Sequence, residues 1–545
     1  MEITIDYSAI PRRGLYFILP DSTYPEKHTQ AWTQGEDTDN HYWVPLYDYP
    51  NDKATTETIL TVEKPYTAIS NGELVSISEN SDGTRTYHWR EGFSHSSYLI
   101  SFAIGDYVKV EDDYQGLPVN YWVYPEVEIN ALRSFGKTPD MIRFFNEKTG
   151  FPYPYEKYDQ VIVEDFMFGG MENITLTHNT DRTIHDSRAT PDHSSDGLVA
   201  HELAHQWYGD LLTTRNWANI WLNEGFATYF AMLYRAEDLG SDEGEYIRLG
   251  QINGYLATDS YKRRPTVEFQ YVESMDLFNS NVYAKGSLIL NMLKQILGED
   301  AFWRSIQSYT RDNAFKNVET TDLIKSIEEV TGQNLDWFFE QWVYRGGVPE
   351  YNVDWNYIRR TGTVVVNVQQ IQDLETTSMF KMPVVIVLDN GKISRHSFWI
   401  DGPQATISIP SSTKPKMVLF DEGNQIPKKL TFKKSISELK YQLENAPHIL
   451  DRISAAKDLG KGPLRRKAQK ALESAIISDP FWGVRLAAVD AYVDLKPKNG
   501  AETLITMSTG QDNRVRRACI RGLRIYEDDQ DAGLFLEGII KNDSS

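Results

Sequence analysis

The sequence predicts a multidomain α+β protein, because blocks of strand-like and helix-like patterning follow one another along its 545 residues. Hydrophobic residues make up 41% of the chain, which is ample for several cores. The order of the blocks predicts four parts: an N-terminal β domain at 1–110, an α/β domain at 111–349, a small β-sandwich at 350–433 and a helical domain at 434–545.

The N-terminal block is predicted as strands from its two-residue period and its turns. Tyr87 and Trp89 alternate with polar residues, and Asn71-Gly72 and Asp82-Gly83 are turn pairs. The opening residues, Met1-Glu2-Ile3-Thr4-Ile5, look like the middle of a strand-rich domain and have the pattern of neither a signal peptide nor an anchor. We therefore expect this domain to be shortened or incomplete.

Helical periodicity defines the second block and strands define the third. Helices begin near Asn130 and include paired helices over 299–346, and Gly346-Gly347-Val348-Pro349 ends the block. Val364–Val368 and Val384–Leu388 then have the composition of buried strands. Together these patterns predict a small sandwich after the helical block.

Three related segments recur in the last block at spacings of 33 and 31 residues. They are Arg452-Ile453-Ser454-Ala455-Ala456, Arg485-Leu486-Ala487-Ala488-Val489 and Arg516-Arg517-Ala518-Cys519-Ile520. Such a period is typical of stacked helix pairs of the HEAT kind, although plain amphipathic helices with chance similarity would also give it. We expect a short HEAT-like domain that ends in a polar tail, Asp543-Ser544-Ser545.

The strongest functional signal is His201-Glu202-Leu203-Ala204-His205, followed by Glu224 after eighteen further residues. Two histidines four residues apart share one face of a helix, and the interval lets a second helix return with a carboxylate. Two imidazoles and one carboxylate form the ligand set of a catalytic zinc site that keeps a fourth position open. Glu202 would face the bound water without being a ligand. The pattern predicts a zinc peptidase.

A bare motif of this kind also arises by chance on a surface helix. The flanking residues argue against that alternative, because Val199, Ala200, Trp207 and Tyr208 are too apolar for a helix that faces solvent. Two buried histidines and a glutamate would be costly without a partner, and a metal ion removes that cost.

Two further segments bear on where a substrate is cut. Gly169-Gly170-Met171-Glu172-Asn173 follows a strand-like run, and Thr33-Gln34-Gly35-Glu36 lies near the start. Paired glycines let a backbone approach a ligand, and an extended segment can pair with a peptide. Glu172 and Glu36 converging on one end of a cleft would bind a free α-ammonium group. Taken singly, each of these glutamates is more often an ordinary surface acid.

These motifs resemble the aminopeptidase N and leukotriene hydrolase family of gluzincin zinc metallopeptidases. The matching stretches are His201-Glu202-Leu203-Ala204-His205, Gly169-Gly170-Met171-Glu172-Asn173, Trp32-Thr33-Gln34-Gly35-Glu36, Asn51-Asp52-Lys53, Pro152-Tyr153-Pro154-Tyr155, Asn223-Glu224-Gly225-Phe226-Ala227, Tyr283-Ala284-Lys285-Gly286 and Gln341-Trp342. The resemblance covers roughly residues 10–350. It implies a thermolysin-like catalytic domain for the second block and a longer N-terminal domain than this chain contains.

The resemblance also implies roles for individual residues. His201, His205 and Glu224 would hold one Zn²⁺, with Glu202 as the general base. Tyr283 would donate a hydrogen bond to the oxyanion, although a tyrosine at the start of an apolar helix is usually a core or cap residue. Gln34, Glu36 and Glu172 would bind the amino terminus. Gly169 and Gly170 would position the first carbonyl, Met171 would line the side-chain pocket, and Asn173 belongs to the same substrate-binding motif.

One position departs from the family pattern. Many relatives have an acidic residue one helical turn before the asparagine-glutamate pair, and here that position is Asn219. We expect that an amide replaces the group that orients a histidine ligand, or that another residue supplies it.

Composition limits the partners. A net charge of −21 argues against nucleic acid and anionic membranes, and the apolar runs are too short to span a bilayer. The single cysteine, Cys519, excludes an intrachain disulfide framework. The expected partners are peptides with a free N-terminus. Localisation is left open: the cytoplasm is favoured, and the periplasm or secretion is the alternative if a leader precedes this sequence.

Three functions compete. A zinc aminopeptidase would remove single residues from peptide N-termini and is the leading hypothesis. The same zinc and acids could instead open an epoxide, but no motif selects that chemistry. A catalytically silent scaffold that binds partners through its HEAT-like part would be expected to lose metal ligands or the base, and all of them are present.

Overall fold

The structure, a computed structural model, describes residues 2–463 and 465–542, so Met1, Leu464 and the predicted tail Asp543-Ser544-Ser545 lie outside it. The chain forms two compact units. The first contains residues up to Ser187, Ser194–Arg235 and Arg264–Arg345, and the second contains Arg188–His193, Ala236–Arg263 and the chain from Gly346 onward.

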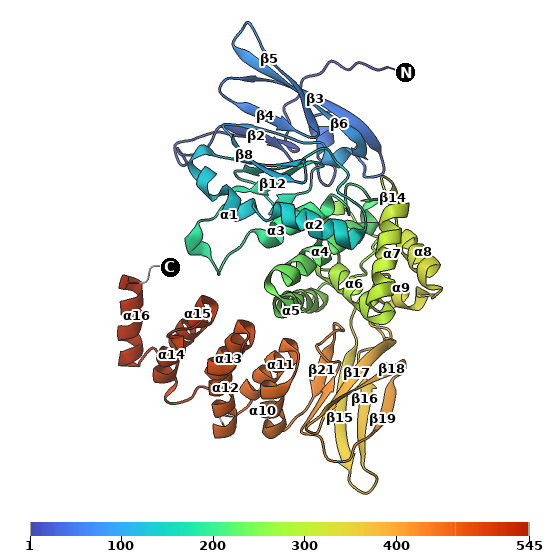
Figure 1. The fold of residues 1–545 in the computed structure, drawn as a ribbon, viewed down its shortest axis with the longest axis vertical. Helices are drawn as coiled ribbons and strands as arrows, with labels where there is room; N and C mark the ends of the chain where they lie inside the picture. Colours follow the sequence, from blue (N-terminus) through green and yellow to red (C-terminus); the bar gives the residue numbers. More distant parts are fainter. Residues whose placement is uncertain (1, 464, 543–545) are drawn as a thin grey trace. The chain divides into compact units, whose positions relative to one another are not determined.

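The N-terminal part of the first unit consists of two antiparallel sheets (Figure 1). One has the order β1-β2-β7-β4, and the other has the order β3-β6-β5. Asn71 and Gly72 connect β4 to β5, as their turn chemistry predicts. The bounds are β1 (Leu15–Ile18), β2 (Gln30–Thr33), β3 (Lys53–Glu63), β4 (Thr67–Ser70), β5 (Glu73–Glu79), β6 (Thr84–Ser96) and β7 (Phe102–Gly105).

A five-stranded mixed sheet follows, with the order β11-β12-β10-β9-β8. Its central strand is fully buried and runs parallel to both neighbours, which explains its nearly continuous apolar run. The two-residue strand β11 lies at the edge of this sheet. The bounds are β8 (Val108–Tyr114), β9 (Leu117–Val123), β10 (Tyr158–Val163), β11 (Gly170–Met171) and β12 (Leu176–Thr180).

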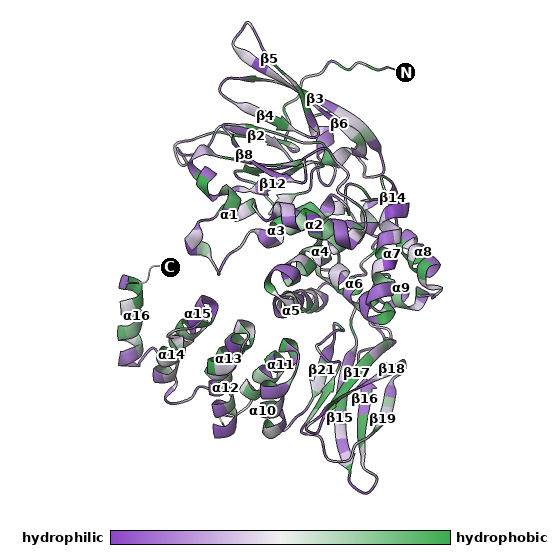
Figure 2. Ribbon diagram, viewed as in Figure 1, coloured by the Kyte–Doolittle hydropathy of each residue, from purple (hydrophilic) through white to green (hydrophobic). Residues whose placement is uncertain are grey.

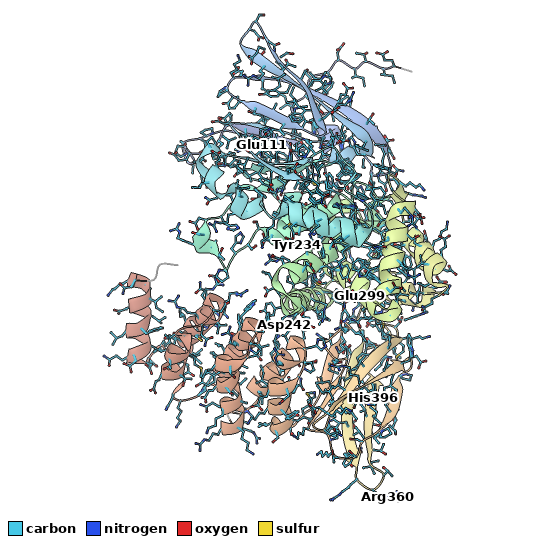
Figure 3. All side chains as sticks on the ribbon, in the orientation of Figure 1. Glu111, Tyr234, Asp242, Glu299, Arg360 and His396 are labelled. Carbon is cyan, nitrogen blue, oxygen red and sulfur yellow. The ribbon has the colours of Figure 1, made fainter. Side chains whose placement is uncertain are left out.

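Helices complete the first unit. The helix expected after Tyr283 is α6, with Tyr283 as its N-cap residue, and the predicted helices over 299–346 are three in number. The bounds are α1 (Ala131–Phe135), α2 (Thr138–Thr149), α3 (Asp196–His205), α4 (Trp221–Leu239), α6 (Ala284–Leu297), α7 (Glu299–Asp312), α8 (Thr320–Thr331) and α9 (Asp336–Trp342). Two-residue strands β13 (Thr213–Thr214) and β14 (Asn317–Val318) pair in parallel. Figure 3 labels Tyr234 on α4 and Glu299 at the start of α7.

In the second unit, the predicted strands form a two-sheet sandwich, with orders β19-β16-β15-β21 and β18-β17-β20. Val364–Val368 lies in β16 and Val384–Leu388 in β17, and Figure 2 shows apolar residues along β17. The bounds are β15 (Glu350–Ile358), β16 (Thr363–Gln370), β17 (Met382–Asp389), β18 (Ile393–Ile400), β19 (Gln404–Pro410), β20 (Met417–Phe420) and β21 (Lys429–Phe432).

The remainder of the second unit is helical. The bounds are α5 (Ser241–Asp259), α10 (Ile436–Asn445), α11 (Ile449–Gly460), α12 (Arg466–Ser478), α13 (Trp482–Asp494), α14 (Gly500–Ser508), α15 (Asn513–Gly522) and α16 (Gln530–Asn542). The recurring segments fall on α11, α13 and α15. Equivalent positions hold the small residues Ala455, Ala488 and Cys519, all fully buried, which lets the helices pack closely.

The recurring arginines have a structural role. Arg452 Nε donates to Asp479 Oδ2 at 2.9 Å, and Arg485 donates to Gln511 at 2.9 Å. Arg452 and Arg485 therefore each bond a residue in the connection that leads to the next recurring segment. The predicted fold class is confirmed, and the bounds of the four predicted parts stay a prediction. Within the described residues, no helix is both long enough and apolar enough to cross a membrane.

Candidate metal centre and substrate site

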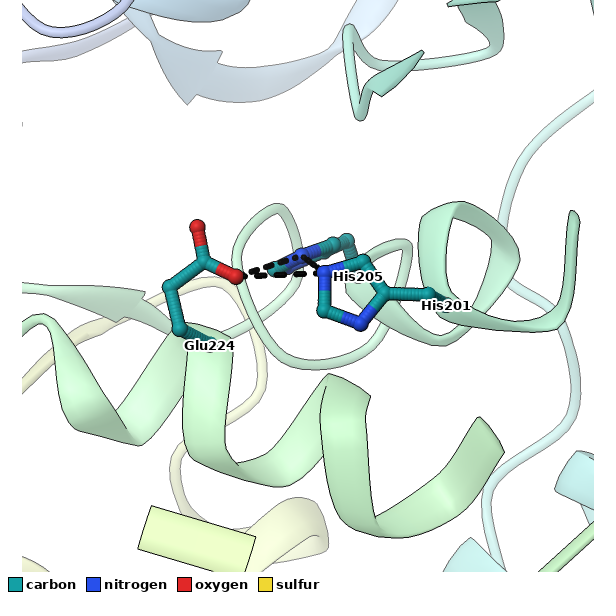
Figure 4. Close-up of side chains that lie close together, drawn as sticks. All are labelled: His201, His205 and Glu224. Atoms are coloured by element: carbon teal, nitrogen blue, oxygen red, sulfur yellow. Dashed lines mark hydrogen bonds and ion pairs between the residues drawn. The ribbon is translucent and has the colours of Figure 1, made fainter. Parts of the chain in front are cut away.

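The predicted metal ligands come from two helices of the first unit. His201 and His205 lie in α3, which ends at His205, and Glu224 lies in the first turn of α4. A 3-10 helix, η6 (Trp217–Asn219), leads into α4. The helical spacing places both histidines on one face, and the returning helix brings the carboxylate to that face (Figure 4).

The three donor atoms lie close together. His201 Nε2 and His205 Nε2 are 3.1 Å apart, and Glu224 Oε2 is 3.2 Å from the first and 3.3 Å from the second. Tetrahedral zinc with ligand distances of about 2.0–2.1 Å separates its ligand atoms by roughly 3.3 Å. The donor set therefore fits a zinc ion in both chemistry and size.

A hydrogen bond fixes the tautomer of His205. Its Nδ1 lies 2.9 Å from the backbone oxygen of Tyr208, which can only accept, so the proton is on Nδ1 and the lone pair is on Nε2. Glu172, Glu202 and His205 form a second possible ligand group. That group would use Nδ1, which is 3.9 Å from Glu172 Oε1 and is already engaged, so the group with His201 and Glu224 is favoured.

The electrostatics of the cluster favour a positive charge. Burial alone would lower the pKa of His205, but the carboxylates of Glu172 and Glu224 hold it well above its usual value. Burial would raise the pKa of Glu224, and the two histidines hold it below its usual range instead. A cation is thus stabilised where the three donor atoms meet, and a divalent metal ion would supply that charge.

The Glu202 carboxylate packs against the edge strand β11 and has an oxygen within 4.8 Å of a ring nitrogen of His205. A Cβ atom on Gly170 would stand 2.5 Å from Glu202 Oε1, so any larger residue at this position would have to displace the carboxylate. Burial raises the pKa of Glu202 well above its usual value, and the positive charge of His205 offsets only part of this increase. The arrangement places a buried carboxylate between the metal cluster and the paired glycines.

Tyr283 lies beside the metal cluster. Its hydroxyl donates to Glu224 Oε1 at 2.9 Å, the carboxylate oxygen that does not face the histidines. Its ring stacks on that of His201, with centroids 6.1 Å apart. Burial and then the Glu224 charge raise the pKa of this phenol well above 10, so the hydroxyl remains a neutral donor.

The three predicted amine-binding residues are brought together at one end of the site. Gln34 Nε2 donates to Met171 Sδ at 3.1 Å, which joins the segment after β2 to the edge strand that precedes Glu172. Burial and then the Glu172 charge raise the pKa of Glu36 well above its usual value. Gln34 Oε1 and Glu36 Oε1 are buried and have no hydrogen-bond partner among the described residues. This end of the site therefore has buried hydrogen-bond acceptors that a bound ligand with N–H groups could satisfy.

Gln206, directly after the metal helix, connects the two ends. Its Nε2 donates to the backbone oxygen of Glu172 at 3.1 Å, and its Oε1 accepts from the backbone N–H of Thr175 at 3.0 Å. These bonds fix the distance between the metal cluster and the loop that carries Glu172. Asn173 in that loop is fully buried, and neither polar atom of its side chain has a hydrogen-bond partner among the described residues.

The backbone of the paired glycines is extended. Gly170 and Met171 pair antiparallel with Asn179 and His178 of β12, and the Gly169 oxygen accepts from the N–H of Thr180 at 2.9 Å. Because β11 is the edge of its sheet, its other side can pair with an extended peptide.

Asn219 forms its hydrogen bonds, as far as the chain is described, with residues other than the histidine ligands. Its Oδ1 accepts from the backbone N–H and the hydroxyl of Thr320, at 3.1 Å and 2.8 Å. The group that orients His205 is instead the backbone oxygen of Tyr208. A contact with a main-chain atom leaves no trace in side-chain identity, so the sequence could not reveal it.

Sequence reasoning missed three further groups near the site. Tyr98 donates to Glu172 Oε1 at 3.4 Å. Asp37 accepts a short hydrogen bond from Ser274. Asp210 is fully buried, its carboxylate has no hydrogen-bond partner among the described residues, and Lys53 Nζ donates to its backbone oxygen at 3.0 Å. In the sequence, only the Asn51-Asp52-Lys53 motif pointed to this region. It identified Lys53, the partner of Asp210, but none of the three groups themselves.

Curated proteins that are similar to this chain include several named aminopeptidases. Aminopeptidase 2 of Candida albicans is 28% identical over 400 residues, which cover 70% of this chain and 42% of that protein. Aminopeptidase M1 of Arabidopsis thaliana is 32% identical over 346 residues, which cover 60% and 38%. The chain spans under half the length of these relatives.

A solved structure has the same fold. The crystal structure of Legionella pneumophila aminopeptidase A in complex with aspartic acid matches with a TM-score of 0.76 at 18% identity, over 98% of this chain and 63% of that one. At this identity the likeness shows the fold alone.

Two family models match the sequence. The peptidase family M1 domain matches residues 133–342, and the peptidase M1 N-terminal domain matches residues 1–99. Together they cover more than half of the chain, including His201, His205, Glu224 and the segment with Gln34 and Glu36. The chain belongs to peptidase family M1.

Proposed function

We propose that this protein is a zinc-dependent aminopeptidase that hydrolyses the first peptide bond of peptides with a free N-terminus. The observation that carries this proposal is a pair of buried acceptors beside Glu172, Gln34 Oε1 and Glu36 Oε1, for which the described part of the chain provides no hydrogen-bond donor. An α-ammonium group offers three N–H donors and one positive charge, which are what this end lacks.

His201, His205 and Glu224 would hold one zinc ion. Their donor atoms lie within 3.3 Å of one another, and the Tyr208 carbonyl orients His205 for ligation. When bound, zinc would supply Lewis acidity that polarises the scissile carbonyl and acidifies water. Zinc dependence is also the expectation for a member of family M1.

The amine-binding end would decide where the chain is cut. Glu172 and Glu36 would pair with the substrate ammonium, and Gln34 would accept one of its N–H groups. Gln206 holds this end at a fixed distance from the metal cluster. Because an acetylated terminus has neither the charge nor the donors, the site would select free N-termini and one residue before the cut.

The remaining groups would handle protons and the backbone. Glu202 would accept a proton from the attacking water and return it to the leaving nitrogen. Tyr283 would turn its hydroxyl from Glu224 toward the developing oxyanion. Gly169 and Gly170 would pair with the substrate backbone along the edge strand, Met171 would line the side-chain pocket, and Asn173 would complete that motif.

The names of the relatives favour cleavage at the N-terminus over internal cleavage. The similar proteins from Candida albicans, Arabidopsis thaliana and Streptomyces lividans are all named aminopeptidases. The acidic end explains that preference physically, because a blocked terminus would leave buried carboxylates without a partner.

The proposal is tested with aminoacyl anilides and their N-acetylated forms, assayed with and without a chelator. We expect hydrolysis of the free form only, its loss on chelation and its return with added zinc. Equal hydrolysis of both forms would overturn the assignment of the amine-binding end. Activity that survives complete removal of metal would overturn the assignment of the metal cluster.

A further inference from the structure

Tyr98 lies where the pieces of the proposed site meet. It belongs to the 3-10 helix η2 (Ser97–Leu99) and is fully buried. Its ring packs edge-on against Trp217, with centroids 5.3 Å apart, directly before the helix that carries Glu224. This packing accounts for an aromatic ring at position 98. It does not account for the hydroxyl, which a phenylalanine would lack.

The hydroxyl has two polar contacts, and their direction is fixed. Asn223 Oδ1 accepts from the backbone N–H of Thr214 at 3.1 Å, so its Nδ2 is the group that faces Tyr98, at 3.3 Å. An amide nitrogen only donates, so the Tyr98 oxygen accepts there. The phenol proton is then directed to Glu172 Oε1, 3.4 Å away.

The backbone of Tyr98 holds the other half of the amine-binding end. A Cβ atom on Gly35 would stand 2.2 Å from the backbone carbonyl oxygen of Tyr98, so only glycine lets the two segments approach this closely. Asn40 Nδ2 donates to the oxygens of Ser97 and Ile100 at 2.8 Å and 3.0 Å. The segment with Gln34 and Glu36 is therefore fixed to η2, on which the Tyr98 hydroxyl also depends.

A neutral donor suits this position. Binding one oxygen of Glu172 restricts the rotation of the carboxylate and leaves its charge in place for a cationic ligand. Burial, and then the charges of Glu172 and Glu36, raise the pKa of Tyr98 well above 10, so the phenol remains a donor. A lysine or arginine here would neutralise the carboxylate and compete with the substrate.

We propose that Tyr98 is a positioning residue that directs the Glu172 carboxylate at the substrate amino group, and that Asn223 couples this direction to the metal-bearing helix. The inference rests on the proposed function and deepens it, because it assigns the recognition of a free N-terminus to a residue outside the ligand and acid motifs.

The test compares two competitive inhibitors, an amino acid hydroxamate and its analogue without the α-amino group, on the whole chain with zinc bound. The variant is Tyr98→Phe. The matched control is Tyr121→Phe, because Tyr121 is also a buried ring whose hydroxyl donates to a carboxylate, that of Asp112 at 2.8 Å, in strands β8 and β9. Metal content and thermal unfolding are measured for each protein.

We expect Tyr98→Phe to weaken the inhibitor with the amine by about three- to tenfold, the size of one hydrogen bond to a charged group that is longer than usual. The analogue without the amine should bind as before, and Tyr121→Phe should change neither affinity. In a Glu172→Ala background, Tyr98→Phe should have no further effect, because the two residues act through one carboxylate.

Two results would overturn the inference: no change in either affinity, or equal weakening of both, which would show a merely structural role. If Tyr98→Phe does not fold, Asn223→Ala releases the hydroxyl and should lower the same preference by a smaller factor. A wild-type protein that does not distinguish the two inhibitors would contradict the proposed function itself. If the wild type distinguishes the two inhibitors and Tyr98→Phe and Asn223→Ala distinguish them equally well, only the role of Tyr98 is contradicted.

Discussion

The two ends of the site differ in how they are assembled. The metal end takes its donors from two consecutive helices, and His201 and Glu224 are only 23 positions apart in sequence. The amine end takes its groups from segments more than a hundred positions apart, with Gln34 contacting Met171 across 137 positions. The metal end depends on the spacing of residues along two helices. The amine end depends on the packing of the N-terminal β domain against the five-stranded mixed sheet.

The ends also differ in how completely their polar groups are paired. The three metal donors contact one another at 3.1–3.3 Å. At the amine end, acceptor atoms of Gln34 and Glu36 are buried without partners among the described residues. A local sequence motif can therefore indicate the chemistry of a site, whereas the substrate specificity of the site depends on packing between segments that are distant in sequence. Changes confined to one end should therefore leave the function of the other end intact.

Removal of the metal should have the largest effect. Chelation should lower kcat/KM by about 10³-fold or more, because the ion contributes several kcal/mol to the transition state. Metal analysis and recovery of activity with zinc check this result. The melting temperature should also fall, since an ion that binds only the folded protein stabilises it. An unchanged melting temperature and full activity would show that the cluster holds no essential ion.

Replacement of the proposed base should have the next largest effect. Glu202→Gln keeps the size of the side chain and removes its basicity, so kcat should fall about 10²–10⁴-fold. Zinc content should stay at one ion per chain. Normal turnover in this variant would mean that another group accepts the proton.

Loss of the Tyr283 hydroxyl should act on the transition state alone. Tyr283→Phe should lower kcat by about 10²–10³-fold with little change in KM, as expected for the loss of one oxyanion donor. Because this hydroxyl also touches Glu224, zinc affinity must be measured alongside. A fall in activity that excess zinc restores would assign Tyr283 to metal binding instead.

Truncation at the amine end should separate the two ends. Glu172→Ala should lower kcat/KM for free N-termini about 10–100-fold, from the loss of hydrogen bonds to a charged group, and should leave metal content unchanged. The preference for free over acetylated substrates should shrink by the same factor. If both kinetic constants match the wild type, Glu172 is not the anchor.

A backbone change should have the smallest effect. Gly170→Ala would place a methyl group 2.5 Å from Glu202 Oε1, and we expect about a tenfold fall in kcat from the displaced base. The control is Gly197→Ala in α3, where a Cβ atom meets nothing within 4 Å, and activity should not change. If both variants have the same activity, the close approach of Gly170 to the base has no catalytic importance.

Much of the fold and the metal end could be predicted from periodicity. The alternation around Trp89, the valine-rich strands and the repeated arginines each depend on neighbours in sequence. Less could be predicted about α5, which packs in the second compact unit although it follows the metal helix. An amphipathic pattern shows that a helix has a buried face, but it does not show which core that face joins.

The residues that hold the site residues in place could not be predicted either, because the sequence pattern does not show which distant groups they contact. Tyr98, Asn223 and Gln206 act through single hydrogen bonds to groups far away in sequence. For the acid missing at Asn219 we expected either an amide substitute or a group supplied elsewhere; Asn219 accepts from Thr320, and the second alternative agrees with the structure. Only the folded chain shows that a main-chain oxygen holds His205.

The central claim is that a closed, acidic end fixes the cut one residue from a free N-terminus. The most direct measurement is a time course by mass spectrometry on one decapeptide and its N-acetylated twin, with zinc present. The claim predicts successive loss of single residues from the N-terminus of the free peptide and no cleavage of the acetylated one. Internal fragments, or trimming of the acetylated peptide at a similar rate, would contradict it.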